Sequence, residues 1–112
     1  MWPFFNFDKV FIDLAWAVKH NETAEQKKLI DYLIRNRRRS VPKLIETLKS
    51  SLFNADVWIN EAQFAGDVLT VLSQDKRSQK TVIKALISVL SEPRGDFQVK
   101  PDWILKEIGV RV

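Results

Sequence analysis

The feature that most constrains the fold is an internal repeat of one amphipathic segment. The stretch SVPKLIETLKS (residues 40–50) matches the stretch TVIKALISVLS (residues 81–91), and the matched pairs include Val41–Val82, Lys43–Lys84 and Ile45–Leu86. In both copies the apolar residues recur every three or four positions, which is the spacing of one helix face. A period of about 40 residues is typical of stacked helical hairpins. We therefore expect a helical chain in which the two copies begin successive hairpins.

Composition sets the size class of the chain and excludes several kinds of site. A chain of 112 residues, 46% hydrophobic and 29% charged, fits one globular domain that can bury a core. Its three glycines and four prolines favour helices over a many-stranded sheet. The absence of cysteine excludes disulfides and thiolate zinc sites and gives no support to an oxidising compartment. We expect a single all-helical domain over residues 1–112, with an aromatic segment at 1–7 and a loop at 92–100.

The apolar runs near the N-terminus do not predict a membrane protein. Residues 10–18 include Asp13 and are far fewer than the roughly 20 apolar residues that a spanning helix needs. Residues 1–7 lack the basic region and the small-residue cleavage site of a secretory signal. We therefore expect a cytoplasmic protein.

The apolar spacing predicts an all-α fold of about six helices that pair as three hairpins. Ser40 is expected to cap the third helix with Pro42 in its first turn, and Ser78 is expected to cap the fifth. Gly109 stands where the last helix needs a C-terminal cap. The predicted helices span about 8–20, 24–37, 40–53, 56–73, 78–91 and 101–108, and consecutive helices form the pairs.

The middle of the chain resembles helical repeats of the HEAT and armadillo type. The first helix of such a repeat often carries Val-Pro-x-Leu-Ile, as this chain does at residues 41–45, and the second is rich in small residues, like AQFAGDVL at residues 62–69. The resemblance covers roughly residues 40–91. It implies a right-handed stack of helix pairs with a binding role, and it implies no specific ligand. A compact six-helix bundle fits the same pattern equally well.

The sharpest local feature is a run of arginines followed, about one repeat later, by a second basic cluster. The residues are Arg35, Arg37, Arg38 and Arg39 in the first cluster and Lys76, Arg77 and Lys80 in the second. Equivalent turns of a stacked array lie on the same edge, so we expect one positive ridge. Such a ridge could bind nucleic-acid phosphates or an acidic protein. The plainer interpretation is that these cations follow helix C-termini, where they offset the helix dipole.

Aromatic residues supply the candidate anchors for a protein partner. Trp2 and Phe4 lie in the N-terminal aromatic segment, and Trp58 is predicted to lie in the fourth helix. The HEAT-like resemblance implies that this helix lines a groove, where Trp58, Asn60, Glu61 and Asp67 could receive a basic or amphipathic peptide. The alternatives are that the N-terminal rings cover the open end of the stack and that Trp58 seals the end of its helix. A membrane anchor has the least support, because no basic amphipathic face accompanies these rings.

No set of residues indicates catalysis, a metal site or a cofactor. His20 is the only histidine, and Ser40 with Lys43 matches the S-x-x-K pattern without its companion motifs. The glycines are isolated and form no phosphate-binding loop. We therefore expect a non-enzymatic protein–protein interaction module, such as an adaptor, an inhibitor or a regulatory subunit. Nucleic-acid binding along the ridge is the alternative, and the two apolar faces of the first helix leave room for a homodimer.

Overall fold

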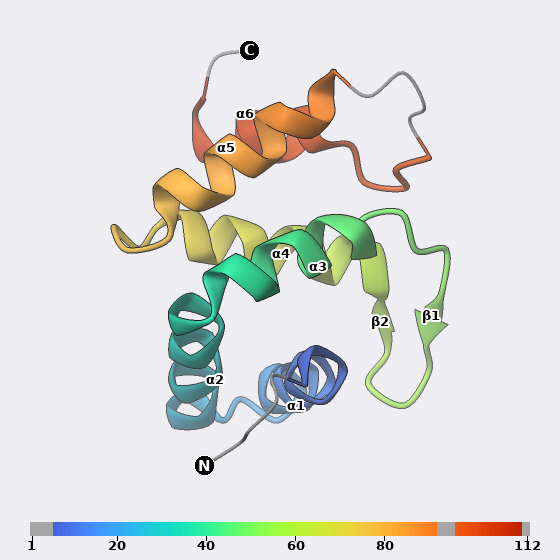
Figure 1. Cartoon of the computed structure of the whole chain (residues 1–112). Coiled ribbons are helices and arrows are strands. Elements are labelled where there is room, and N and C mark those ends of the chain that lie inside the picture. The colour runs from blue at the N-terminus through green and yellow to red at the C-terminus, as the bar shows by residue number, and fades with distance from the viewer. Residues whose placement is uncertain (1–5, 92–95, 111–112) are drawn as a thin grey trace.

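The fold consists of helices with one short β-hairpin, as seen in a computed structural model that describes residues 6–91 and 96–110 (Figure 1). Within those residues the elements are α1 (Phe7–Lys19), α2 (Thr23–Arg35), α3 (Arg37–Thr47), β1 (Phe53–Asn54), β2 (Ile59–Asn60), α4 (Glu61–Ser73), α5 (Gln79–Leu90) and α6 (Pro101–Ile108). The predicted all-α class with six helices is confirmed. None of the helices in the described part of the chain is long and apolar enough to cross a membrane.

Consecutive helices pack as three pairs: α1 with α2, α3 with α4, and α5 with α6. In addition α3 packs against α5 and α4 against α6, so the second and third pairs form two layers (Figure 1). The first pair is turned relative to these layers, and α2 runs across the direction of α3 (Figure 1). The two copies of the repeated segment lie in α3 and α5. The HEAT-like resemblance stays a prediction, because pairs of this kind also build a compact bundle.

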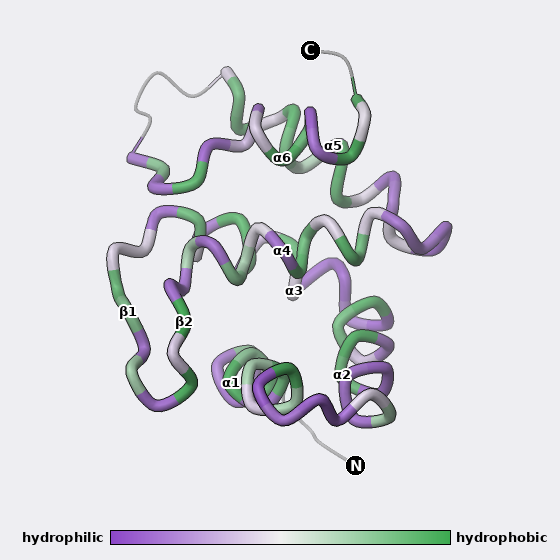
Figure 2. The backbone as a smooth tube through the Cα atoms, turned by 180° about the vertical axis from the view of Figure 1, so that it is seen from behind, coloured by the Kyte–Doolittle hydropathy of each residue, from purple (hydrophilic) through white to green (hydrophobic). Residues whose placement is uncertain are grey.

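One hydrophobic core extends through the helix pairs. The side chains of Leu14, Leu33, Leu44, Leu69, Leu86 and Leu105 are among those fully buried. The aromatic rings of Phe11 in α1 and Phe64 in α4 meet edge to face with centroids 5.2 Å apart, which joins the first pair to the second. Along α2, hydrophobic and hydrophilic residues alternate within each turn, as expected of a helix with one buried face (Figure 2).

The third helix begins three residues earlier than predicted, because a single residue, Asn36, separates α2 from α3. The prediction that Ser40 caps this helix was therefore wrong. Ser40 is a buried residue in the interior of α3 and not at its start. Its hydroxyl and the side chains of two other residues that follow α2 donate hydrogen bonds to the last carbonyls of α2. These bonds run from Asn36 to Tyr32 (2.9 Å), from Arg37 to Ile34 (3.2 Å) and from Ser40 to Leu33 (2.7 Å).

Two other predicted positions within the helices also change. Pro42 lies in the interior of α3 and not in its first turn, so the carbonyl of Arg38 loses the backbone donor that another residue would provide. Ser78 precedes α5 as predicted, but its hydroxyl donates to the carbonyl of Leu72 in α4 and not to an amide of α5. Gly109 ends α6 at a φ of 96°, the left-handed conformation expected of a C-terminal cap.

The predicted helices 40–53 and 56–73 are too long, because a β-hairpin lies between them. The helix α3 ends at Thr47, and the carbonyl of Leu48 accepts hydrogen bonds from the backbone amides of Gln98 (2.9 Å) and Val99 (3.2 Å). The helix α4 begins at Glu61, where the side chain of Asn60 accepts a hydrogen bond from the amide of Gln63. The intervening residues 53–60 are free to form the hairpin.

Candidate partner-binding surfaces

The most exposed large apolar side chain in the described structure is Trp58, which is 75% exposed. Trp58 lies in the turn between β1 and β2, so the predictions that it belongs to the fourth helix and seals its end were wrong. Its ring meets that of Phe53 edge to face at 5.0 Å, and Leu52 is exposed beside them in the sequence. We call Leu52, Phe53 and Trp58 the hairpin patch.

The hairpin is fixed to the rest of the molecule at several points. Phe53 pairs with Asn60, and Asn54 with Ile59, in antiparallel register. The side-chain oxygen of Asn54 accepts hydrogen bonds from the amides of Asp56 (3.0 Å) and Val57 (3.4 Å). Two contacts reach beyond the hairpin: Val57 is buried in the core, and Lys19 of α1 donates its Nζ proton to the carbonyl of Asp56 at 2.9 Å. The turn that presents Trp58 is thus held by the core through Val57 and by α1 through Lys19.

The backbone of Trp58 is strained, because its φ is 55°. Non-glycine residues with bulky side chains rarely adopt the left-handed region. Conformations of this kind are kept where the surrounding structure enforces them, and they concentrate at functional sites. In this conformation the side chain of Trp58 is 75% exposed.

The other two predicted protein anchors, Trp2 and Phe4, lie outside the described residues. The first aromatic residue within them, Phe7, is buried and stacks on Phe11 with ring centroids 5.4 Å apart. Phe7 therefore belongs to the core and not to a surface patch.

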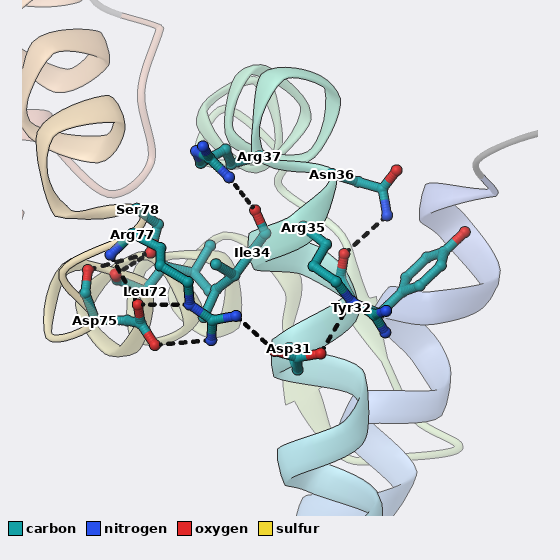
Figure 3. Close-up of polar contacts among 10 residues, drawn as sticks. All are labelled: Asp31, Tyr32, Ile34, Arg35, Asn36, Arg37, Leu72, Asp75, Arg77 and Ser78. Carbon is teal, nitrogen blue, oxygen red and sulfur yellow. Dashed lines mark hydrogen bonds and ion pairs between the residues drawn. The ribbon is translucent and has the colours of Figure 1, made fainter.

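The two predicted basic clusters approach each other at one carboxylate, that of Asp31 in α2. Arg35 contacts it through Nε at 2.9 Å, and Arg77 contacts it through Nη1, also at 2.9 Å (Figure 3). Arg77 comes from the turn between α4 and α5, which is hydrophilic (Figure 2). Asp31 thus brings the clusters together and at the same time neutralises part of their charge.

A second carboxylate, that of Asp75, binds Arg77 more fully than Asp31 does. The guanidinium of Arg77 donates from Nη2 at 3.0 Å and from Nε at 3.1 Å, and the Arg77 amide donates at 2.8 Å (Figure 3). The side-chain hydrogen bond from Arg77, followed by its backbone one, holds the pKa of Asp75 below its usual value. Hydrogen bonds to Asp75 first and Asp31 second raise the pKa of Arg77. Arg77 is therefore committed to contacts within the chain.

The predicted ridge consequently divides into engaged and free cations. Arg35 and Arg77 form ion pairs, and the half-buried Arg37 donates to the carbonyl of Ile34. This last contact agrees with the plainer interpretation, in which cations satisfy helix C-termini. Four cations are exposed and form no ion pair with any residue in the described ranges: Arg38, Arg39, Lys76 and Lys80.

Sequence reasoning missed a groove of about 340 Å³ between α4 and α6. Its lining combines the indole of Trp103 with the carboxylates of Asp67 and Glu107. The sequence predicted a groove in which Asp67 lies with Trp58. In the structure Asp67 instead lines a groove whose indole is that of Trp103. The sequence did indicate the position of Trp103. It precedes the apolar pair Ile104–Leu105, so a helix that buries this pair places Trp103 at the edge of its buried face.

The candidate catalytic residues are engaged in structural contacts. Ser40 is buried with its hydroxyl bonded to Leu33, and His20 ends α1 with its ring stacked on Trp16 at 5.4 Å. Within residues 6–91 and 96–110, no three histidine or acidic side chains gather as metal ligands would. These residues provide no arrangement that we can assign to a reaction.

Comparison with known proteins found no match. No family model, no curated protein and no solved structure matches this chain. Its function has to be inferred from its own surfaces.

Proposed function

We propose that this chain is a non-enzymatic protein-binding module whose anchor is the hairpin patch. The observation that carries the proposal is that Trp58 is 75% exposed in a strained turn that is tied to both α1 and the core. Interfaces gain most of their affinity from a few aromatic residues, and tryptophan is enriched among them. An anchor that is already ordered loses little conformational entropy when the partner binds.

The surroundings of the patch suggest the chemistry of the partner. Between residues 50 and 74 the chain carries the acids Asp56, Glu61 and Asp67 and no basic residue, and the one basic side chain described at the turn, that of Lys19, is bonded to the carbonyl of Asp56. A partner that offers an apolar socket with a basic rim would complement this surface, since rim charges steer encounter while the socket supplies affinity. An adaptor, an inhibitor or a regulatory subunit would use such a surface. We propose the cytoplasm as its compartment, because a chain without cysteine needs no oxidising environment for disulfides.

The proposal is tested by comparing two variants in affinity capture. We expect Phe53→Ala with Trp58→Ala to lose a partner that the wild type retains, with a fall in affinity of at least about 30-fold for each dominant anchor. Trp103→Ala is the matched control, because it removes an exposed tryptophan far along the chain. Affinities are then measured by calorimetry with the purified partner, and circular dichroism checks that both variants fold.

Two outcomes of this comparison would contradict the proposal. Retention of every captured protein by the hairpin variant would remove the patch as the anchor. Loss of the partner on Trp103→Ala alone would transfer the role to the groove between α4 and α6. A patch that pairs with a second copy of the chain would appear as a dimer in sedimentation, and the dimer would be lost in the hairpin variant.

A second candidate function, nucleic-acid binding, is favoured by the four unpaired cations of the predicted ridge. Arg38, Arg39, Lys76 and Lys80 are exposed, and no acid in the described ranges neutralises them. Free cations release counterions when they meet phosphates, and this release drives binding.

A further inference from the structure

The exposed residues of α3 and α5 form one stripe along each helix. On α3 the exposed positions are 38, 39, 42, 43 and 46, opposite the buried positions 40, 41, 44 and 45. On α5 the exposed positions are 79, 80, 84, 87 and 88, opposite the buried positions 82 and 86. Each set recurs every three or four residues and therefore occupies one side of its helix.

The two stripes point to the same side of the molecule. The helices α3 and α5 pack side by side, α3 also packs on α4, and α5 also packs on α4 and α6. Their exposed sides therefore face away from the layer of α4 and α6. Both helices run in the same direction, so that their N-terminal halves lie next to each other (Figure 1).

Cations occupy both stripes at helical spacing. Arg39 and Lys43 lie four residues apart on α3, and Lys80 and Lys84 lie four residues apart on α5. One such step rises about 6 Å along a helix, and packed helices lie about 8–10 Å apart. We call these four residues the α3–α5 face. The sequence repeat explains the pattern, because it aligns Arg39 with Lys80 and Lys43 with Lys84.

None of these four cations is neutralised within the described part of the chain. No ion pair involves Arg39, Lys43, Lys80 or Lys84. The acid on the exposed stripe of α3 is Glu46, which lies one turn beyond Lys43 and pairs with Lys49 at 3.5 Å. Two members of the predicted ridge, Arg35 and Arg77, differ in this respect, since Asp31 and Asp75 engage them.

We infer that the α3–α5 face, which shares Arg39 and Lys80 with the predicted ridge, binds the phosphate backbone of duplex nucleic acid, and that the paired ridge residues Arg35 and Arg77 do not. The inference rests on the second candidate function proposed above. It favours phosphates over an acidic protein because no aromatic side chain lies among the exposed residues of either stripe, and protein interfaces depend on such anchors. It favours a duplex over a single strand because single strands bind by stacking on aromatic rings.

The test measures binding of a fluorescently labelled DNA duplex by anisotropy over a series of salt concentrations. With four phosphate contacts, log K is expected to fall with log salt at a slope of about −3.6. Lys43→Gln with Lys84→Gln should bring the slope closer to zero by about 2 and weaken binding at least tenfold at low salt. The matched control, Lys27→Gln with Lys106→Gln, changes net charge equally at exposed lysines of α2 and α6 and should change binding far less.

The remaining outcomes separate the inference from the function on which it rests. Equal losses in the control variant would mean that overall charge binds the duplex, and the inference would fail. A larger loss on Arg35→Gln with Arg77→Gln would assign binding to these two paired arginines, so the function would stand and the inference would fall. No binding at low salt would overturn both. Tighter binding of polyglutamate than of the duplex would assign the face to an acidic protein.

Discussion

Replacing Phe11 with alanine is expected to lower the free energy of unfolding by about 3–5 kcal/mol. Phe11 is 4% exposed, and its ring contacts those of Phe7 and Phe64 with centroids 5.4 Å and 5.2 Å away. Its removal would open a cavity where the first helix pair meets α4. Because a domain of this size is stabilised by only about 5–15 kcal/mol, the variant should approach unfolding at room temperature. Urea denaturation followed by circular dichroism measures the change.

The control for Phe11 lies on the same helix. Trp16 is 39% exposed and contacts Lys19 and His20, both also on the surface. Trp16→Ala is expected to cost less than about 1 kcal/mol, because it gives up surface contacts and leaves no buried cavity. Equal losses in the two variants would mean that the aromatic cluster of Phe7, Phe11 and Phe64 does not hold the first pair in place.

Replacing Leu86 with alanine is expected to cost about 2–5 kcal/mol. Leu86 is 0% exposed and is the buried residue of α5 that the sequence repeat aligns with Ile45 of α3. Its side chain fills the space between α5 and the helices on which α5 packs, so the loss includes both transfer and cavity terms. Thermal and urea unfolding of the purified variant should show a lower midpoint with an unchanged urea slope.

The next residue provides the control for Leu86. Ile87 is 49% exposed on the outer side of α5, and Ile87→Ala should change stability by less than about 1 kcal/mol. If Ile87→Ala destabilised the protein as much as Leu86→Ala, the outer side of α5 would be covered and not free. That result would also count against the α3–α5 face, which shares this side.

The helices and much of the core could be predicted from the sequence, because the patterns that indicate them involve residues close together in the chain. The residues Val41 and Val82 are both buried, and each belongs to a stripe that recurs every three or four positions. Gly109 likewise signals the end of α6, since glycine adopts its φ of 96° without strain. Periodicity and caps of this kind depend only on near neighbours.

The hairpin could not be predicted in the same way, because distant residues stabilise it. Lys19 fixes the turn at Asp56, and the amides of Gln98 and Val99 bond to Leu48 where α3 ends. Within the sequence alone, the apolar residues of this stretch fit the continuation of a helix. The misassigned role of Trp58 follows from the same cause.

The candidate site shows the same division between local and distant information. The basic clusters are visible in the sequence, but Arg77 meets Asp31 across 46 positions, a contact that no local pattern indicates. Ser40 is a second example, because a serine before an apolar stripe suits an N-terminal cap as well as a bond to the preceding helix. Tertiary contacts therefore decide which cations are free.

Hydrogen exchange of the protein alone and bound to its captured partner would test the central claim most directly. The hairpin patch as the anchor predicts slower amide exchange across residues 52–60 in the complex, with little change on the outer sides of α3 and α5. Unchanged exchange in the hairpin, together with slower exchange at α4 and α6 around Trp103, would contradict the hairpin patch as the anchor and place the interface at the groove between α4 and α6.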